Sequence, residues 1–372
     1  MKILCLSRAP LDYKGGIPTY CLNLYGNNKF QVTNYSYDLS KKLKRRENRI
    51  IQNIEEIVYP SQIIFGTFAI SIGYFLSILI NTKKFNVIHV QHPDPFSSIC
   101  AILTKIKNPK IKLIVTWHAD IYSSYLLFSP FLIIIDFLLF SLSSKIIFFT
   151  KMHLKNSFIK NIKFLRNKVN LIPCCINIDF NKNYNDNFEY GLKNKKSINI
   201  LSIGRLVKYK GYEFAIKAIS KTPKNVNYKI IGNGPLKKNL QDLIYLNKLE
   251  DRVFLMEKID DEVKNKLLSE ADIFLFPSIS NAEAYGLVQF EAMANYLPII
   301  NTDLNNGVNF LVPEDVAITC KIKNSIEISK AINKLIKDEE FYLNKKNKSA
   351  KNLSRFKLED MLSNFKDLLL EI

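Results

Sequence analysis

Several patterns that would point directly to a chemistry are missing from this sequence. Its six cysteines include no Cys-x-x-Cys pair, and no cysteine and histidine spacing is that of a metal site. Three of the cysteines lie in apolar strand or helix patterns, where buried free thiols are usual. These absences argue against a disulfide-stapled or metal-centred domain and favour a reduced compartment.

A clear membrane span is also missing. The apolar stretch 63–80 contains two glycines and leads directly into a strand pattern, so we expect a buried or interfacial helix there. The stretch 125–140 contains Pro130 and Asp136 and falls short of the roughly 20 residues that a span needs. The first residues, "MKILCLSRAP", are too short in apolar character for a signal peptide and predict a first strand, so the expected location is cytoplasmic.

Acidic residues are scarce relative to basic ones. Lys and Arg total 53 against 34 for Asp and Glu, which gives a formal net charge of +19. Such a bias suits nucleic acid, anionic lipid or phosphorylated small molecules as partners. Many of the lysines sit in Asn/Lys/Ile-rich stretches that are typical of AT-rich genomes, so charge alone does not choose among these partners.

What is present is a regular alternation of short β-branched runs with longer amphipathic segments. This pattern predicts parallel sheets wound through βαβ units, and 372 residues suit two domains. The alternation starts again near Ser197, after a polar Asn/Lys-rich segment. We therefore predict two doubly wound Rossmann-like domains at 1–176 and 197–350, a linker at 177–196, and a C-terminal helix at 351–372 that packs back on the body.

Ligands of open α/β sheets bind outside the carboxyl ends of the strands, so the segments that follow strands matter most. In the first half these are "YKGGIPTY", "QHPDP" and "WHAD"; in the second half they are "GRLVKYKG", "GNGPL" and "PSISNAEAYG". Arg205 offers a planar fork and Lys210 a mobile charge, so together they could neutralise a diphosphate without metal. The alternative is a solvated basic loop. Gly232 and Gly234 could admit a ligand to the backbone or simply form a tight turn.

Two glutamates flank the last of these segments. Gly286 and Leu287 are expected near a helix N-terminus, which favours an anion. Glu291, one turn further on, could accept hydrogen bonds from a ribose, and Glu283 could hold sugar hydroxyls. The alternative is an amphipathic helix with two solvated acids.

"GRLVKYKG", "GNGPL" and "EAYGLVQFEAMA", in this order and spacing, resemble the retaining GT-B glycosyltransferases of family 4. Glu283 and Glu291 match the E-x7-E motif of that family, "KGGIPTY" its glycine-rich loop and "WHAD" its histidine region. The resemblance covers nearly the whole chain. It is greatest to the branch that builds bacterial surface polysaccharides, including lipopolysaccharide O-antigen.

This resemblance implies two Rossmann-like domains that face each other across a cleft, with a nucleotide sugar bound mainly by the second domain. It implies no metal ion and no cofactor beyond a GDP- or UDP-linked sugar as co-substrate, in keeping with the absence of an Asp-x-Asp motif. The implied catalytic residues are His118, Arg205, Lys210 and Glu283. The implied donor-binding residues are Gly15, Gly16, Gly204, Arg205, Lys210, Gly234, Glu283, Ala284, Tyr285, Gly286, Leu287, Val288 and Glu291.

For His118 the alternative to a catalytic role is a core histidine that caps a strand. For His92 the sequence supports a functional and a structural role equally. The sequence departs from the family in two places. Cys174 and Cys175 replace the usual turn residues of the hinge, and "EDVAITCKIKN" replaces a Gly-x-Thr-Gly. Loop geometry and contacts to the donor base are the features that these changes affect.

The expected function is a membrane-peripheral glycosyltransferase that moves a hexose to a saccharide or polyprenyl-linked saccharide acceptor at the inner face of the cytoplasmic membrane. Anionic lipid would be bound by a basic cluster, Lys41, Lys42, Lys44, Arg45, Arg46 and Arg49, beside the apolar residues 63–75. A solvated loop is the alternative for that cluster. Rivals for the whole chain are a sugar-nucleotide epimerase or a soluble-acceptor enzyme on the same fold, a nucleic-acid-binding protein, and a catalytically inactive scaffold. The basic cluster lacks the interleaved aromatic residues that nucleic-acid binding favours, so we expect no nucleic-acid partner.

Overall fold

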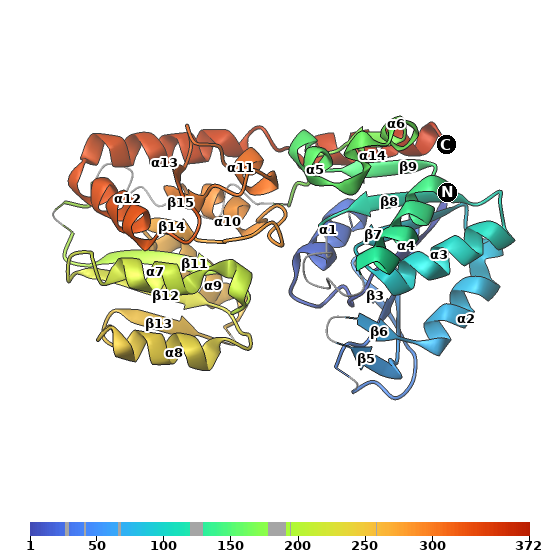
Figure 1. Ribbon diagram of the computed structural model, residues 1–372, viewed down its shortest axis with the longest axis horizontal. Coiled ribbons are helices and arrows are strands. Elements are labelled where there is room, and N and C mark those ends of the chain that lie inside the picture. The colour runs from blue at the N-terminus through green and yellow to red at the C-terminus, as the bar shows by residue number, and fades with distance from the viewer. Residues whose placement is uncertain are drawn as a thin grey trace. The chain divides into compact units, whose positions relative to one another are not determined.

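The fold was analysed in a computed structural model, which describes residues 1–26, 30–40, 42–65, 68–119, 129–177, 191–193, 195–257 and 259–372. The chain divides into two compact units (Figure 1). Unit 1 comprises Met1–Asn177 and Lys357–Ile372, and unit 2 comprises Ile178–Phe356. Of the expected linker, residues 178–190 and 194 lie outside the described residues.

Unit 1 is built on an eight-stranded sheet of order β10-β9-β8-β7-β1-β2-β4-β3, in which β3 runs antiparallel to β4 and the other pairings are parallel. Its strands are β1 Lys2–Leu6, β2 Gln31–Tyr37, β3 Glu47–Ile51, β4 Ile54–Tyr59, β7 Val87–His92, β8 Lys112–Trp117, β9 Lys145–Phe148 and β10 Val169–Leu171. The central strands β1, β7 and β8 are almost wholly buried, as expected for a parallel sheet covered on both faces, and β7 buries His89, Gln91 and His92 along with its apolar residues.

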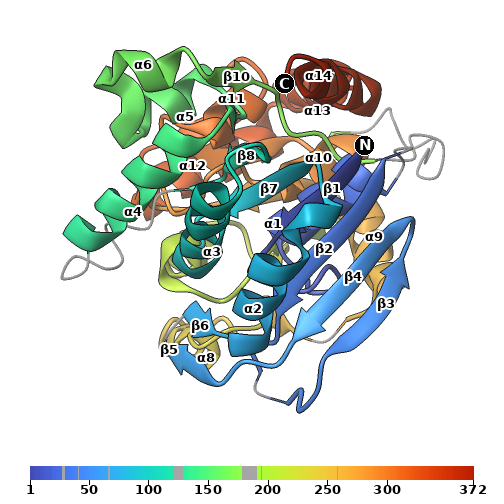
Figure 2. The same ribbon diagram turned by 90° about the vertical axis from the view of Figure 1, so that its right-hand side faces the viewer.

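Helices cover both faces of this sheet (Figure 2). Helices α2 Ile72–Asn81, α3 Pro95–Lys107 and α4 Ser129–Leu142 pack side by side over one face. On the other face, α1 Gly16–Tyr25 contacts α14 Leu358–Leu370, which brings the C-terminal segment back to unit 1. The smaller elements are η1 Thr82–Lys84, α5 Lys151–Asn156, η4 Phe158–Asn161 and α6 Lys163–Arg166.

The apolar stretch 63–80 is not the single buried or interfacial helix expected from the sequence. Strands β5 Ile63–Phe65 and β6 Phe68–Ile70 form an antiparallel hairpin, and α2 begins only after it. The β-branched and aromatic residues of the hairpin favour strand over helix. Ser71 then starts α2 as its N-cap, because its hydroxyl accepts a hydrogen bond from the backbone N–H of Tyr74 at 3.3 Å.

Unit 2 is built on a six-stranded, all-parallel sheet of order β13-β12-β11-β14-β15-β16. Its strands are β11 Ile198–Ile203, β12 Val226–Ile231, β13 Val253–Met256, β14 Ile273–Phe276, β15 Ile299–Thr302 and β16 Ile318–Cys320. Its helices are η5 Lys208–Lys210, α7 Tyr212–Ile219, α8 Lys237–Leu246, α9 Asp261–Glu270, α10 Val288–Ala294, α11 Gly307–Leu311, α12 Ser325–Lys337 and α13 Glu339–Leu353. The chain order reverses between β11 and β14, and such a switch point is where doubly wound sheets bind ligands.

The two doubly wound sheets confirm the fold class expected from the strand runs, but the sequence analysis missed several strands of unit 1. Strand β2 was missed because its inward side chains are polar. Asn34 and Ser36 both donate hydrogen bonds to the fully buried carboxylate of Glu56 on β4, at 2.9 and 3.3 Å. Hydrogen-bonded polar side chains therefore stand at buried positions where a strand usually has apolar residues.

The C-terminal boundary also differs from the expected one. Residues 351–353, assigned from the sequence to the terminal helix, complete α13 in unit 2. The terminal helix proper is α14, which begins at Leu358. Within the part of the chain that the structure describes, no helix has both the length and the apolar content of a membrane span.

Candidate functional site

The loops that leave β11 and β14 bring the cationic and acidic candidates of unit 2 to one edge of its sheet. After β11 come Gly204 and Arg205, then the turn η5, which ends at Lys210. After β14 comes the loop that carries Glu283 and leads into α10. Because both strands end at the switch point of the sheet, residues far apart in sequence meet there.

Lys210 and Glu283 form an ion pair between Nζ and Oε2. Each residue is only 9% exposed, so the two charges are largely removed from water. Ser278 donates a further hydrogen bond to the same carboxylate oxygen at 3.2 Å. The ammonium group also lies 5.0 Å from the ring centroid of Phe276 and 5.7 Å from that of Tyr209, within cation–π range. A charge pair this buried is held in one geometry by its surroundings.

Arg205 differs from Lys210 in its surroundings. Its side chain is exposed, and among the described residues no carboxylate forms an ion pair with it. The edge of the sheet thus carries one cation that is already paired and a second that is open to an incoming anion.

Glycines let the backbone pack closely around this ion pair. Gly211 has φ +66°, and a Cβ there would lie 2.1 Å from the carbonyl oxygen of Pro277. A Cβ at Gly204 would lie 2.9 Å from the Tyr212 hydroxyl and 3.0 Å from Cε of Lys210. Both positions therefore require glycine to seat the Lys210 side chain against the loop after β14.

Gly232 and Gly234 of the "GNGP" segment serve packing between loops. A Cβ at Gly232 would lie 1.9 Å from the Gly204 carbonyl oxygen, and one at Gly234 would lie 2.5 Å from the Leu206 carbonyl oxygen. The loop after β12 is therefore pressed against the loop after β11. The sequence left open whether these glycines admit a ligand to the backbone or form a tight turn. The close packing of the two loops explains both glycines without a ligand.

The second glutamate lies where its spacing suggested, in the first turn of α10. Glu291 forms an ion pair with Lys264 of α9, with 2.9 Å between Oε2 and Nζ. Between the glutamates, Gly286 has φ +74°, Tyr285 is buried, and Ala284, Leu287 and Val288 continue the chain into α10.

The sequence analysis did not single out the groups that hold the two glutamates. Asn306 donates to the Glu283 carbonyl at 2.6 Å, and Ser278 and Lys264 bind the carboxylates. Ser278 stands directly in the segment after β14, so its position could have flagged it. Lys264 and Asn306 carry no local signal, because only the tertiary fold brings α9 and the loop after β15 to this edge.

In unit 1, His118 follows β8 and lies at the carboxyl edge of that sheet. Its Nε2 lies 2.8 Å from Oε1 of Gln91 on β7, and its ring is buried against Tyr20 and Phe149. Burial, together with the nearby His89, His92 and His153, holds the pKa of His118 well below its usual value. The imidazole is therefore neutral at physiological pH. Asp120, its expected neighbour, lies outside the described residues.

The other candidates of unit 1 are Gly15, Gly16 and His92. Gly15 is the N-cap of α1 and Gly16 its first residue, and a Cβ at Gly15 would meet nothing closer than Tyr13, at 3.5 Å. His92 lies 3.0 Å from Asp136 within the core, through Nε2 and Oδ2, which gives it a structural partner.

The basic cluster proposed as a membrane anchor is only partly free. Arg49 forms two hydrogen bonds with Asp12, at 2.8 and 2.6 Å, and a third with Glu56 at 2.8 Å. Arg49 is thus neutralised by one exposed and one buried carboxylate and does not belong to an open cationic surface. Lys42 lines a hollow of about 500 Å³ that it shares with Asp12, Asp38 and Arg49, and Lys41 lies outside the described residues.

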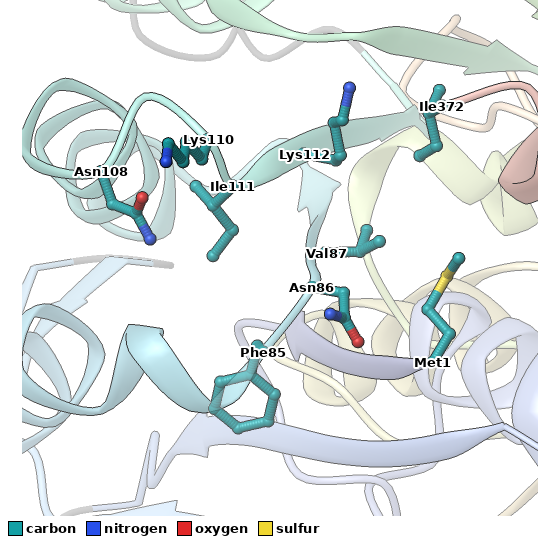
Figure 3. A pocket seen from close by; sticks show the side chains of 9 residues that line it. All are labelled: Met1, Phe85, Asn86, Val87, Asn108, Lys110, Ile111, Lys112 and Ile372. Carbon is teal, nitrogen blue, oxygen red and sulfur yellow. The ribbon is translucent and has the colours of Figure 1, made fainter.

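A second hollow of unit 1 is lined by none of these groups (Figure 3). It has a volume of about 560 Å³ and is lined by Met1, Phe85, Asn86, Lys110 and Ile372, among others. These residues mark the amino ends of β1, β7 and β8. Ligands of parallel sheets bind at the opposite edge, so this hollow is not the candidate site.

Parts of this chain are similar to known proteins. Residues 183–353 match the family model "Glycosyl transferases group 1". An uncharacterized glycosyltransferase of Haemophilus influenzae is 31% identical over 46% of this chain, and the match spans 48% of that relative, about half its length. Protein CapJ of Staphylococcus aureus is 26% identical over 86% of this chain and 81% of its own. The O-antigen biosynthesis glycosyltransferase WclY of Escherichia coli is 29% identical over 65% of this chain and 67% of its own.

Among solved structures, HepE of Anabaena in complex with UDP superposes with a TM-score of 0.79 over all of both chains, at 16% identity. Sucrose-phosphate synthase of Thermosynechococcus elongatus gives 0.77 over all of this chain and 98% of its own, at 15% identity. Similarity at this level of identity establishes the fold. The fold of this protein is therefore GT-B, and its residues 183–353 are similar to the glycosyl transferases group 1 family.

Proposed function

We propose that this protein is a retaining glycosyltransferase of family 4. It moves a hexose from a UDP- or GDP-linked donor to a lipid-linked saccharide acceptor in the assembly of a bacterial surface polysaccharide. The observation that carries the proposal is the buried Lys210–Glu283 ion pair beside the open Arg205, at the switch point of the unit 2 sheet. A nucleoside diphosphate sugar needs a cationic site for its diphosphate and acceptors for its hydroxyls, and these residues supply both.

The comparisons support a nucleotide sugar as partner. Anabaena HepE was solved with UDP-glucose as well as with UDP. WclY is named for O-antigen biosynthesis, and a further relative is a putative colanic acid biosynthesis glycosyltransferase. These names favour a surface polysaccharide as the product.

In the proposed reaction, Arg205 binds diphosphate oxygens through its planar guanidinium. The incoming diphosphate also attracts the Lys210 ammonium away from Glu283. The freed carboxylate of Glu283 then accepts hydrogen bonds from the sugar. Binding of the diphosphate and recognition of the sugar are thereby coupled through one ion pair.

The transfer breaks the bond between the anomeric carbon and the diphosphate oxygen, and it forms a bond to the acceptor oxygen on the same face. The acceptor hydroxyl proton goes to the departing diphosphate, so no protein nucleophile is needed. Arg205 and Lys210 stabilise the charge that develops on the leaving group, without a metal ion. His118 enters as a neutral hydrogen-bonding group of unit 1.

Glu291 is proposed to accept hydrogen bonds from the ribose hydroxyls. Its ion pair with Lys264 leaves the side chain 30% exposed. Lys264 thus orients the carboxylate without covering it.

Calorimetric titration with UDP, GDP and the matching nucleotide sugars tests these roles. Glu291→Ala should weaken binding of the bare nucleotide about tenfold, since one hydrogen-bonded carboxylate is lost. Glu283→Gln should not weaken binding of the bare nucleotide, because it frees Lys210 for the diphosphate, and it should weaken binding of the sugar-bearing donor. If both variants bind every ligand as the wild type does, neither acid takes part in donor binding and the proposal fails.

The reaction class has its own test. Purified protein with donor, acceptor and EDTA should give a product whose anomeric configuration, read by NMR, is that of the donor. Release of an epimerised free sugar would instead identify an epimerase, and a strict need for added Mg²⁺ or Mn²⁺ would overturn the metal-independent mechanism.

A further inference from the structure

Helix α4 of unit 1 is apolar all round, yet half of its surface is exposed. Its sequence, "SPFLIIIDFLLFSL", contains a single charged residue, Asp136, which is buried beside His92. Leu132, Ile135 and Leu139 face the core, whereas Phe131 and Ile134 are 59% and 57% exposed and Leu138 extends the same outer stripe. An apolar outer face is typical of a helix that another apolar phase covers.

The neighbouring elements extend this surface. Helix α2 contains no charged residue, and Ile72, Leu76 and Ile80, four positions apart, form an exposed stripe along it. Helix α3 lies between α2 and α4 and exposes Leu103 and Ile106 (Figure 2). We call the exposed apolar side chains of α2, α3 and α4 the apolar face.

The charges that accompany this face are of one sign. Between residues 68 and 177 the described acidic residues are Asp94 and Asp136, and both are buried. Exposed lysines lie just beyond the C-terminal ends of the helices: Lys83 and Lys84 after α2, and Lys107 and Lys110 at the end of α3. The described part of this surface therefore offers apolar groups and cations without an exposed anion.

We propose that the apolar face docks on an anionic lipid bilayer. The apolar side chains enter the boundary between headgroups and acyl chains, and the lysines bind lipid phosphates at the rim, where their long stems allow them to reach water. The inference rests on the proposed function in one respect, because a lipid-linked acceptor makes a membrane the expected partner. It assigns the contact to α2, α3 and α4 in place of the basic cluster at 41–49, whose Arg49 is already bound to Asp12 and Glu56.

A protein partner fits this surface less well. Protein interfaces surround an apolar centre with a polar rim, which here would have to be acidic throughout on the partner. A second copy of this chain would bring cations against cations, because the face carries the same charges on both copies. A bilayer that contains anionic lipid matches both the apolar and the cationic character.

Cosedimentation of the full chain with phosphatidylcholine vesicles, with and without phosphatidylglycerol, tests the proposal. Wild type should bind the anionic vesicles and release partly as salt rises. The variant Phe131→Gln, Ile134→Gln, Leu138→Gln should need at least about tenfold more lipid for half-maximal binding. Its matched control removes three exposed apolar residues of unit 2, Tyr245→Gln, Leu246→Gln and Ile326→Gln, and should bind as wild type does.

The charges are tested separately. Lys83→Gln, Lys84→Gln, Lys110→Gln should weaken binding to anionic vesicles, whereas Lys217→Gln, Lys221→Gln, Lys224→Gln on unit 2 should not. UDP titration of each variant shows whether unit 2 is intact, so a failure of docking is distinguishable from a failure of the proposed function. The proposal is overturned if the α4 variant binds vesicles like wild type, or if wild type ignores vesicles and sediments as a dimer that this variant dissociates.

Discussion

Units 1 and 2 share one architecture but place opposite kinds of groups at the carboxyl edge of the sheet. Unit 2 presents Arg205 and the Lys210–Glu283 ion pair, which are charged groups held close to one another. Unit 1 presents His118, whose pKa burial lowers so that it stays neutral, next to the uncharged amide of Gln91. The same winding of strands and helices thus supports a site for an anion in one unit and a neutral hydrogen-bonding site in the other, because loop residues rather than the sheet decide the chemistry.

The units also differ in their titratable content. All four histidines of the chain, at positions 89, 92, 118 and 153, belong to unit 1. Unit 2 contains no histidine and instead forms ion pairs between lysines and carboxylates, such as Lys210–Glu283 and Lys264–Glu291. We therefore expect the two units to respond differently to charge removal and to acid.

The largest effect should come from the open cation of unit 2. Arg205→Ala should lower turnover by about 10²- to 10³-fold, because a lost charge at the leaving diphosphate costs about 3 to 4 kcal/mol in the transition state. Steady-state kinetics with the nucleotide sugar measure this. The matched control is Lys208→Ala, an exposed cation three residues away on the same loop, which should change turnover little. Equal losses for both variants would mean that this edge acts only through its overall positive potential.

Breaking the buried ion pair should affect stability. Lys210→Met should lower the free energy of unfolding by about 3 kcal/mol, since it leaves the Glu283 carboxylate buried without its cation. Adding Glu283→Met should restore most of that loss, though not activity. Urea unfolding measures both, and Lys266→Met, in an exposed pair with Glu270, should cost no more than about 0.5 kcal/mol. A double variant as unstable as the single one would contradict the pairing.

Glycine substitutions compare the backbone of the two edges. Gly211→Ala should cost unit 2 at least about 2 kcal/mol, because φ is +66° and the new Cβ would meet the Pro277 carbonyl oxygen at 2.1 Å. Gly15→Ala in unit 1 should change stability by no more than about 0.5 kcal/mol, since its backbone is extended and the space is open. Thermal melts measure both. If Gly15→Ala also keeps full activity, the phosphate-binding role expected for Gly15 is lost.

Acid should weaken unit 1 through its buried histidines. Burial lowers the pKa of His89 from 6.5 to about 3, so the unfolded chain takes up a proton that the native ring refuses. The contribution of His89 is complete above the unfolded pKa and is lost as the pH falls from about 6.5 toward 3. Because of His89, the free energy of unfolding should fall by up to about 1.4 kcal/mol for each pH unit. Burial lowers the pKa of His118 as well, so His118 adds to this loss.

Urea unfolding at several pH values between about 6.5 and 4.5 checks this. His89→Gln should reduce the slope by about the contribution of one histidine, even if it also lowers stability at neutral pH, since the ring bonds Tyr25 and Thr116. An unchanged slope would show that His89 titrates normally in the native state. Fluorescence of Trp117, the single tryptophan, reports on unit 1.

Local sequence was sufficient to predict much of the fold. Strands such as β1, β8, β11 and β14 consist mainly of apolar residues, because a parallel sheet buries both faces of its strands. The hairpin β5–β6 and the strands β2 to β4 could not be predicted in the same way. Their pattern is short or polar, and the buried Glu56 that organises β2 and β4 gains partners such as Leu11 and Asn34 from residues distant in sequence.

The sequence by itself determined the doubly wound fold and the candidates Arg205, Lys210, Glu283 and Glu291, because strand ends and charged loops can be recognised from short stretches of sequence. Only the tertiary structure decided that Lys210 is paired with Glu283 while Arg205 stays open. That distinction depends on which loops the order β11–β14 brings together and on how much water remains around each charge. Tertiary structure likewise turned Arg49 toward Asp12 and Glu56 and left the outer stripes of α2 and α4 exposed, since burial is set by packing between elements and not by hydrophobicity along the chain.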